Sequence, residues 1–473
     1  MALFARFGAS HDEKAAPPAR SAGAEPKQDT QPVSHDVRPT VSAEAIASDK
    51  RERMISTKIE IHQVLLETLN LHLLDSVPRE TLREQIDPVI AQEVRNRALA
   101  LNRSEYLAFV EEIIDEMVGL GPLEALLKDD TISDILINTH EHIFVERFGK
   151  LEPTAVRFRD EPHLLRVINK IVSAVGRRVD ESVPLCDARL QDGSRINVAV
   201  RPITVDGPAV SIRKFAKKKL SLERMVEGGT LRGPMAEVLA KACWGKVTII
   251  VSGGTGSGKT TMLNALSSAI SPSERLVTIE DAAELQLQQP HVVRMETRPP
   301  NLEGKGEIRQ RELVMNALRM RPDRIILGEI RGGEAFDMLQ AMNTGHEGSL
   351  ATVHANTPRD ALARIEQMVT MSGLPISQAS IRNQIASALH VIVQLNRLSD
   401  GKRKIVSVSE ITGMEGDIIQ MQEIFAFKRT GTGPDGAVLG EFRATGVRPR
   451  FAEELMTRGV VFPSSYFDPG KPL

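Results

Sequence analysis

Apolar residues recur at helical spacing in the first quarter of the chain. Within 59–74 they fall three or four residues apart, which is typical of a helix that buries one face. A second such face lies in 103–123 and is formed by Leu107, Val110, Ile114 and Val118. Ser104 is a candidate N-cap for this second helix, and two glycines after it are expected to end it. The pattern predicts a small helical bundle over 51–120.

The two ends of the chain have weaker patterns. Residues 1–50 are rich in Ala, Pro, Ser and charged residues and hold almost no large apolar side chains. Such a segment cannot offset its own chain entropy by burial, so we expect a disordered tail. At the other end, 426–473 contains the turn-rich stretch 430–440 and predicts a hairpin or loop followed by a poorly ordered tail.

Between 121 and 213 the pattern changes to short runs of β-like residues. They alternate with one helical stretch at 163–175, and the runs occupy 135–138, 142–146, 196–200 and 209–212. Turn residues punctuate the runs closely, which favours a mostly antiparallel sheet. We expect an α/β N-terminal domain over 121–213. The basic and then glycine-containing segment 214–231 predicts an interdomain linker.

From 232 to 425, continuous apolar runs are each followed by a helical pattern. The runs occupy 247–252, 276–280, 324–329, 349–354 and 391–395. Apolar strands that alternate with helices indicate a parallel sheet covered on both faces. The fold class is therefore predicted as α/β, with the larger domain over 232–425.

Composition narrows the classes of protein that fit. The chain has 473 residues, of which 41% are apolar and only 4% aromatic, so aliphatic side chains must fill its cores. The formal net charge of −2 argues against a general nucleic-acid-binding protein, and no nucleic-acid partner is expected. Cys186 and Cys243 are predicted to be small core residues of a reducing compartment. No run of about 18 apolar residues is present to span a membrane, and a signal peptide's apolar core is missing from the first residues. We expect a cytoplasmic protein.

The stretch 251–266, VSGGTGSGKTTMLNAL, carries the pattern G-x-x-x-x-G-K-[ST] between an apolar strand and a helix. Glycines allow backbone N–H groups to surround a phosphate, and the helix that follows points its N-terminal dipole at it. Lys259 is expected to reach the β- and γ-phosphates of ATP, and the Thr260 hydroxyl to ligate Mg²⁺. The predicted nucleotide-binding residues here are Gly253, Gly254, Thr255, Gly256, Ser257, Gly258, Lys259, Thr260 and Thr261.

Acidic residues follow two other apolar strands. Glu329 ends the run 325–329, and Glu280, Asp281 and Glu284 end the run that begins at 276. Ligands of doubly wound sheets sit at the carboxyl ends of the strands, where these carboxylates can hold Mg²⁺ through water and position an attacking water. The alternative for the second group is an acidic first turn of a helix, which suits Asp and Glu in any case.

Two histidines, His346 and His354, flank the run 349–354. Histidines are common zinc ligands, but no cysteine or third histidine lies near them in the sequence. A sensor of the γ-phosphate is the favoured interpretation for this pair.

In order and spacing, these four motifs resemble the Walker A, Asp, Walker B and His boxes of the secretion and pilus ATPases in the type II/type IV secretion superfamily. The resemblance covers about 115–425. In detail the chain is most similar to the CpaF branch, which powers tight-adherence (Flp) pili. The stretches that carry this are 119–138, 187–200, 208–215, 311–358 and the N-terminal helical bundle.

The resemblance implies a homohexamer in which each subunit has an α/β N-terminal domain, a flexible linker and a RecA-like P-loop domain. It implies that Glu284 orients or activates the attacking water, and that Glu329 supports Mg²⁺. It also implies that arginines of the N-terminal domain reach the γ-phosphate; the candidates are Arg195 and Arg213, with Arg201 and Arg189 as substitutes. The implied partners are platform proteins of a pilus at the inner membrane and accessory pilus-assembly proteins.

Three alternatives stay open. A conjugation or type II secretion ATPase would share the four boxes, although the four-cysteine zinc motif of many type II members is absent here. A nucleic-acid motor would require a basic channel, and a non-hydrolysing nucleotide switch would be expected to lack one of the boxes.

Overall fold

The computed structural model describes residues 57–58, 60–61, 64–65, 79–190, 192–215, 221–300, 304–471 and 473. The chain divides into two compact units, Met1–Leu69 and Asn70–Leu473, and the second unit is described here. The predicted disordered tail (1–50) and most of the helix predicted over 59–74 lie outside the described residues.

The second unit begins with two helices that pack on each other. They are α2 (Arg79–Asn96) and α3 (Arg103–Met117). The predicted N-cap of α3, Ser104, is wrong: Asn102 caps the helix. Its side chain accepts the N–H of Glu105 at 2.9 Å, and the Glu105 carboxylate accepts the N–H of Asn102 at 2.8 Å. Two donors of the first turn are thus satisfied reciprocally. Leu107 was also misplaced, because it is 42% exposed while Phe109 is buried.

The N-terminal domain is a six-stranded antiparallel sheet packed against one long helix and one short one. Its elements are α4 (Leu123–Lys128), β1 (Ile132–Ile137), β2 (Ile143–Arg147), β3 (Lys150–Pro153), α5 (Glu161–Ala174), β4 (Leu185–Arg189), β5 (Arg195–Ala199) and β6 (Ala209–Arg213). The order is β3-β2-β1-β6-β5-β4. The antiparallel prediction is confirmed. The strands β3 and β4 were missed, since β3 is exposed at every position and shows no alternation.

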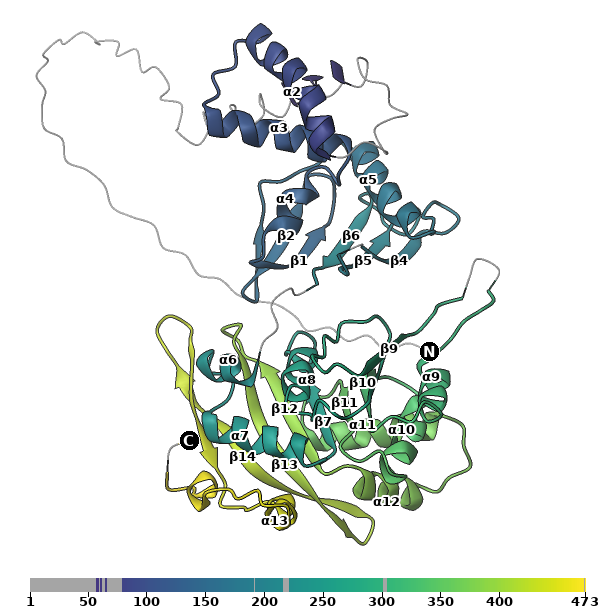
Figure 1. The fold of residues 1–473 in the computed structure, drawn as a ribbon, viewed down its shortest axis with the longest axis vertical. Coiled ribbons are helices and arrows are strands. Elements are labelled where there is room, and N and C mark those ends of the chain that lie inside the picture. Colours follow the sequence, from purple (N-terminus) through teal and green to yellow (C-terminus); the bar gives the residue numbers. More distant parts are fainter. Residues whose placement is uncertain are drawn as a thin grey trace, which may run out of the picture. The chain divides into compact units, whose positions relative to one another are not determined.

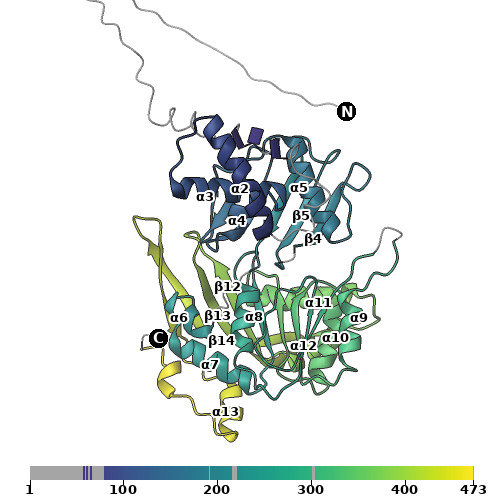
Figure 2. The same cartoon turned by 45° about the horizontal axis from the view of Figure 1, so that its top comes forward.

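The C-terminal domain is built on a nine-stranded sheet of order β15-β14-β13-β12-β7-β11-β10-β8-β9 (Figures 1 and 2). Its strands are β7 (Ile249–Gly253), β8 (Leu276–Glu280), β9 (Val292–Glu296), β10 (Arg324–Ile330), β11 (Leu350–Val353), β12 (Val391–Arg397), β13 (Arg403–Glu415), β14 (Ile418–Thr432) and β15 (Val438–Ala444). The six strands from β12 to β9 in this order run parallel, as predicted for 232–425.

Helices cover both faces of the parallel strands. They are α6 (Leu222–Glu227), α7 (Gly233–Trp244), α8 (Lys259–Ser267), α9 (Gln310–Ala317), α10 (Glu334–Asn343), α11 (Pro358–Met371) and α12 (Gln378–Ala388). Successive side chains of β7 enter different cores: Ile249 and Val251 pack with α6 to α8, and Ile250 packs with α9 to α12. Both cysteines are buried as predicted, and burial raises the pKa of the Cys243 thiol to about 12. Among the described residues, no helix is long and apolar enough to cross a bilayer.

Two boundary predictions are corrected. The end of the larger domain at 425 cuts through β14. The hairpin predicted around 430–440 is formed by β14 and β15, whereas the predicted poorly ordered tail instead forms α13 (Arg450–Thr457) and the 3₁₀ helix η2 (Ser464–Phe467). Phe451, Phe462 and Phe467 of this segment are buried in the same core as α7. The linker predicted over 214–231 is shorter than expected, because α6 belongs to the core of the C-terminal domain; 216–220 lie outside the described residues.

Arg324 of β10 forms a buried ion pair and hydrogen bonds that connect this strand to neighbouring segments of the domain. The Arg324 side chain is fully buried, and its guanidinium binds Glu274 through two bonds, Nε to Oε2 at 2.7 Å and Nη2 to Oε1 at 2.8 Å. The same guanidinium donates to the carbonyls of Cys243 at 2.5 Å and Gly348 at 3.2 Å. All of these acceptors would lose a donor together if the side chain were removed.

Replacing Arg324 with alanine should therefore destabilise the protein strongly. The loss leaves the carboxylate of Glu274 with the more distant ammonium of Lys246, at 3.8 Å, and removes a donor from two carbonyls. Breaking one side of a buried pair costs about 3–5 kcal/mol. Urea unfolding measures the change. Arg319→Ala, at an exposed position in the preceding turn, is the matched control and should stay within about 0.5 kcal/mol. Equal midpoints for the two variants would contradict the structural role of Arg324.

Candidate functional site

The loop between β7 and α8 is shaped by two glycines of positive φ. Gly256 has φ +68° and Gly258 has φ +96°, values that side-chain-bearing residues rarely adopt. The Lys259 ammonium donates to the carbonyl of Gly254 at 3.0 Å, and the Ser257 hydroxyl donates to the same carbonyl at 2.9 Å. The loop thus folds over itself, with Lys259 as the first residue of the helix.

The other predicted boxes follow strands that neighbour β7. In the sheet order β7-β11-β10-β8, His354 follows β11, Glu329 lies near the end of β10, and Asp281 follows β8. Because these strands are parallel, their carboxyl ends meet at one edge of the sheet, beside the loop that holds Lys259. The structure therefore brings the predicted Walker A, Walker B, Asp-box residues and one of the two histidines together.

Glu280, the last residue of β8, has a loop-building role. It is 3% exposed, and its Oε2 accepts the backbone N–H groups of Glu284 at 2.7 Å and Leu285 at 2.8 Å. Burial raises the pKa of Glu280. On the neighbouring strand, a Cβ on Gly328 would stand 2.9 Å from Cγ of Glu280, so only glycine fits there. Glu280 thereby shapes the loop that presents Glu284.

Electrostatics link the lysine to the groups around it. Burial lowers the pKa of Lys259, and the carboxylate of Glu329 opposes that shift. The pKa of His354 is lowered first by burial and then by the positive charge of Lys259. At neutral pH, His354 is therefore held as the neutral imidazole, which can both donate and accept a hydrogen bond.

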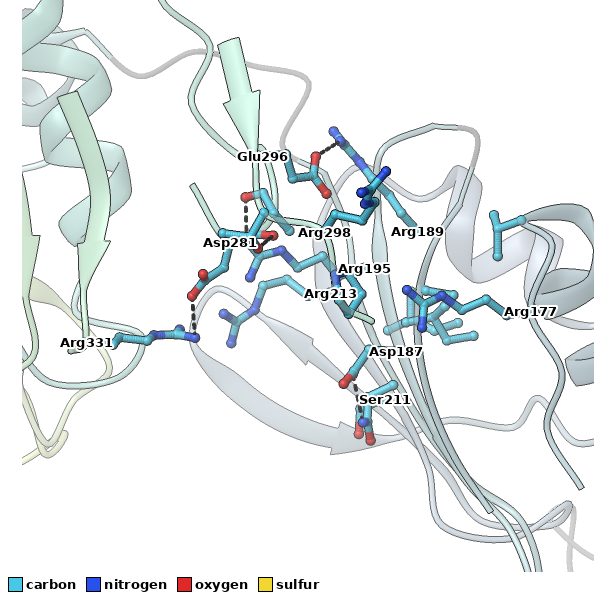
Figure 3. A pocket seen from close by; sticks show the side chains of 18 of the residues that line it. Arg177, Asp187, Arg189, Arg195, Ser211, Arg213, Asp281, Glu296, Arg298 and Arg331 are labelled. Carbon is cyan, nitrogen blue, oxygen red and sulfur yellow. Dashed lines mark hydrogen bonds and ion pairs between the residues drawn. The ribbon is translucent and has the colours of Figure 1, made fainter. Parts of the chain in front are cut away.

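Three arginines of the N-terminal sheet form a cross-strand row. Arg189 on β4 pairs in register with Arg195 on β5, and Arg195 pairs with Arg213 on β6. Directly opposed residues of antiparallel strands point to the same face, so the three guanidinium groups share one side of the sheet. They line a cavity of about 950 Å³ whose lining also includes Asp281, Glu296 and Arg331 (Figure 3).

Two members of the row contact the segment that follows β8. Arg195 makes an ion pair with Glu284, Nη1 to Oε1 at 3.2 Å, and donates to the carbonyl of Ala282 at 2.6 Å. Arg189 donates to the carbonyl of Ala283 at 3.0 Å and pairs with Glu296 at 3.1 Å. Arg195 is thus in direct contact with the Asp-box glutamate, and Arg189 with the backbone of the same loop.

The other two candidate arginines differ. Arg213 pairs with Asp134 at 3.2 Å, and its charge is close enough to lower the pKa of Lys259 further, after the larger effect of burial. Arg201 lies in the loop after β5 and pairs with Glu161 at the start of α5, at 3.4 Å. The structure does not bring Arg201 to the site.

His346 is also placed elsewhere. It precedes β11, and its Nδ1 lies 3.2 Å from the carbonyl of Ala341 in α10. The neighbouring Gly348 bonds to Thr248 at the start of β7, at the amino ends of the parallel strands. The prediction that His346 contacts the nucleotide is therefore corrected. The strand β11 lies between the two histidines and places His354, but not His346, at the carboxyl edge of the sheet.

Two site residues were missed by the sequence analysis. Arg331 makes ion pairs with both Asp281 and Glu329, and Arg403 of β13 donates to the carbonyl of Gly256 in the glycine loop at 2.9 Å. For Arg331 a local signal existed, a cation two residues after a strand-end carboxylate. For Arg403 no local signal existed, since the contact depends on β13 pairing with β12 beside β7.

The family described as Type II/IV secretion system protein matches residues 116–435. The chain belongs to this family. One relative, from Mycobacterium tuberculosis (strain ATCC 25618 / H37Rv), is provisionally named as a conjugal transfer protein. It is 36% identical over 324 residues, which cover 67% of this chain and 92% of that protein. The conjugal transfer protein TrbB of Rhizobium radiobacter is 32% identical over 300 residues, covering 61% of this chain and 86% of that protein.

Solved structures that resemble this secretion-system family member include the VirB11 ATPase from the Brucella suis type IV secretion system. That chain is 29% identical, with a TM-score of 0.33 over 61% of this chain and 94% of its own. The family match ends at residue 435, in the turn between β14 and β15. The strand β15 and the helix α13 therefore lie beyond the matched residues.

The residues of this family member fit a nucleotide with Mg²⁺. At Gly254, the space where a Cβ would stand holds no atom within 4 Å, so a ligand can approach the backbone closely. The Thr260 hydroxyl and the Glu329 carboxylate are oxygen ligands, which Mg²⁺ prefers. The buried Oε1 of Glu280 has no hydrogen-bond partner among the described residues, so it could accept one from a bound group.

Proposed function

We propose that this chain is an ATP-hydrolysing motor of a secretion-type machine. The observation that carries the proposal is the convergence of Lys259, Glu329 and Glu284 at the carboxyl ends of neighbouring parallel strands. A glycine loop with a lysine binds phosphates, and a nearby carboxylate can position water for attack on the terminal phosphate. Membership of the secretion-system family supports the same conclusion.

Each side chain has a defined task in this proposal. Lys259 neutralises phosphate charge, and Thr260 and Glu329 hold Mg²⁺, the latter through water. When bound, Mg²⁺ neutralises charge on the phosphate oxygens. Glu284 orients the attacking water, and its ion pair with Arg195 fixes where its carboxylate points. Arg195 and Arg213 supply positive charge to the γ-phosphate, and His354 senses it.

Hydrolysis would be converted to motion between domains. The phosphates rest on the C-terminal domain and the arginines belong to the N-terminal domain, so loss of the γ-phosphate removes a charge that both domains hold. Such a change drives rigid-body rotation about a linker. We propose that six copies form a ring and that the ring transmits this rotation to an assembly platform at the inner membrane.

For the apparatus that is served, we propose a tight-adherence (Flp) pilus, on the stretches 119–138 and 311–358 that resemble the CpaF branch. A conjugation system is the second candidate, because two of the relatives carry names of conjugal transfer proteins. Deleting the gene and measuring surface pili and conjugation frequency side by side distinguishes these two. Loss of pili with normal conjugation supports the first, and the reverse supports the second.

The hydrolysis itself is tested with Glu284→Gln. Glutamine keeps the shape of the side chain but removes the charge that orients water, so kcat should fall about 10²- to 10⁴-fold. The affinity for ATP should stay close to that of the wild type, since Glu284 does not hold the phosphates. Steady-state phosphate release and equilibrium binding measure the two quantities.

The matched control is Glu347→Gln, at an exposed position beyond the opposite edge of the sheet, which should hydrolyse ATP normally. Normal turnover by Glu284→Gln would show that the Asp-box loop has a structural role and no role in hydrolysis. A wild-type protein that binds ATP and releases no phosphate would contradict the proposed function as a whole.

A further inference from the structure

Arg331 occupies the turn between β10 and α10, and its backbone is held in place. The N–H groups of Arg331 and Gly332 both donate to Oε1 of Glu334, each at 2.7 Å. Glu334 is only 7% exposed, at the first turn of α10. Because a buried carboxylate fixes this turn, the side chain of Arg331 leaves the backbone in a defined direction.

The guanidinium of Arg331 joins two carboxylates of neighbouring strands. Its Nη1 lies 2.9 Å from Oδ2 of Asp281, and its Nη2 lies 2.7 Å from Oε2 of Glu329 (Figure 3 shows the first pair). The remaining oxygen of Asp281 accepts a bond from the side chain of Gln310 at 2.9 Å. A planar fork can hold two carboxylates at fixed positions, which a single ammonium cannot copy.

The register of the sheet explains why a cation is needed at this point. Ile279 of β8 pairs with Leu327 of β10, so Asp281 and Glu329 are equivalent positions two residues further along adjacent parallel strands. Two carboxylates this close repel each other unless a positive group lies between them. Gly328 leaves room for the side chain of Glu280 on the adjacent strand, because a Cβ there would stand 2.9 Å from Cγ of Glu280.

Of the two cations near Glu329, Arg331 is the one that binds it directly. Both Arg331 and Lys259 interact electrostatically with Glu329, and the guanidinium is the group within hydrogen-bond distance of it. The ammonium of Lys259 stays on the carbonyl of Gly254 in its own loop.

We propose that Arg331 is a positioning residue that ties the Asp box to the Walker B glutamate by holding Asp281 and Glu329 at fixed positions. The inference rests on the proposed function, since it concerns carboxylates of the same site. The ion pairs are partly exposed, with the side chain of Arg331 58% accessible, so they contribute little to stability. Their value lies in the geometry that they fix.

The first test compares Arg331→Ala and Arg331→Lys with Arg311→Ala. Arg311 is the matched control, because it makes one ion pair, with Asp337 at 2.8 Å, between α9 and α10. The alanine variant of Arg331 should lose about 10- to 100-fold in kcat, the equivalent of one or two charge-assisted hydrogen bonds. Arg331→Lys should recover less than half of the lost kcat, measured on a logarithmic scale. Arg311→Ala should have the kcat of the wild type.

The second test is a double-mutant cycle with Asp281→Asn, read as affinity for a fluorescent ATP analogue with Mg²⁺ and with EDTA. Arg331→Ala should weaken binding with Mg²⁺ at least fivefold and leave binding with EDTA unchanged. In the Asp281→Asn background, Arg331→Ala should lose less than half as much binding free energy, because one of the two partners of Arg331 is already neutral.

Additive effects in the cycle, or full activity of Arg331→Lys, would overturn the positioning role. A loss of folding would appear as a lowered unfolding midpoint of Arg331→Ala relative to Arg311→Ala, and would also contradict it. Failure of the proposed function is distinct: it would appear as no phosphate release by the wild type, while the binding cycle would still report on Arg331.

Discussion

Lys259→Ala should abolish ATP hydrolysis and leave the fold intact. The lysine is the cation in the glycine loop, and removing preorganised charge from a phosphate-transfer site costs about 10³-fold or more in rate. The Lys259 ammonium donates to the carbonyl of Gly254 in the same loop, and no other element among the described residues accepts a hydrogen bond from it. The loss of that one bond is worth about 1 kcal/mol, which makes a small change in unfolding midpoint.

The measurement is steady-state phosphate release, with binding of ATP and ADP measured separately. Lys428→Ala is the matched control, because this lysine lies exposed on β14, far along the sheet from β7. Wild-type turnover by Lys259→Ala would show that the glycine loop is not part of the hydrolytic site. A large drop in its unfolding midpoint would show that the lysine has a structural role instead.

Replacing Arg195 and Arg213 together with alanine should reduce hydrolysis by about 10³- to 10⁵-fold, the range that charge-stabilising arginines contribute in other NTPases. The two guanidinium groups stand side by side on β5 and β6, so either single variant is expected to be partly compensated by the other. The affinity for ADP should change little, because ADP has no γ-phosphate for these groups to hold.

Arg201→Ala is the control for this pair, since Arg201 belongs to the same domain and pairs with Glu161 instead. Mixing Arg213→Ala with Lys259→Ala subunits asks whether the arginine acts on its own subunit. Recovered turnover means that it acts across subunits, and no recovery means that it acts within one. Wild-type hydrolysis by the double variant would contradict the proposed role of the row.

Local patterns were sufficient where the chemistry lies within one short stretch. The apolar run at 276–280 coincides with β8, and the glycine loop follows its strand as expected. In both cases, neighbours in sequence are also neighbours in space, so spacing alone carries the information. The antiparallel N-terminal sheet was also predicted, because its hairpin turns are local.

Contacts between strand ends could not be predicted in the same way. Whether Arg331 reaches Asp281 depends on β8 lying next to β10, which is a property of the sheet order. The same limitation misled the assignment of His346: it stands eight positions before His354, but a strand lies between them and carries them to opposite edges.

The C-terminal segment was misjudged for a related reason. Phe451 and Leu455 are at helical spacing in α13, but this helix is short, and Phe462 and Phe467 beyond it follow no regular period. They are buried because β13, β14 and β15 extend the sheet and present Phe425 and Phe442 as a surface to pack on. The rings of Phe425 and Phe467 stack with centroids 5.9 Å apart. The burial of Phe462 and Phe467 depends on this long-range surface, which the local sequence around them does not indicate.

The cross-strand row of arginines also constrains how related chains can differ in length. Residues of a strand alternate between two faces, so inserting one residue within β5 or β6 would turn Arg195 or Arg213 to the opposite face of the sheet. The connection over 200–208 lies outside the strands and can lengthen without that inversion. In a sequence alignment of distant family members, a one-residue gap inside β5 or β6 would therefore match these arginines to residues on the opposite face of the sheet. Gaps should be placed in the connecting loop instead.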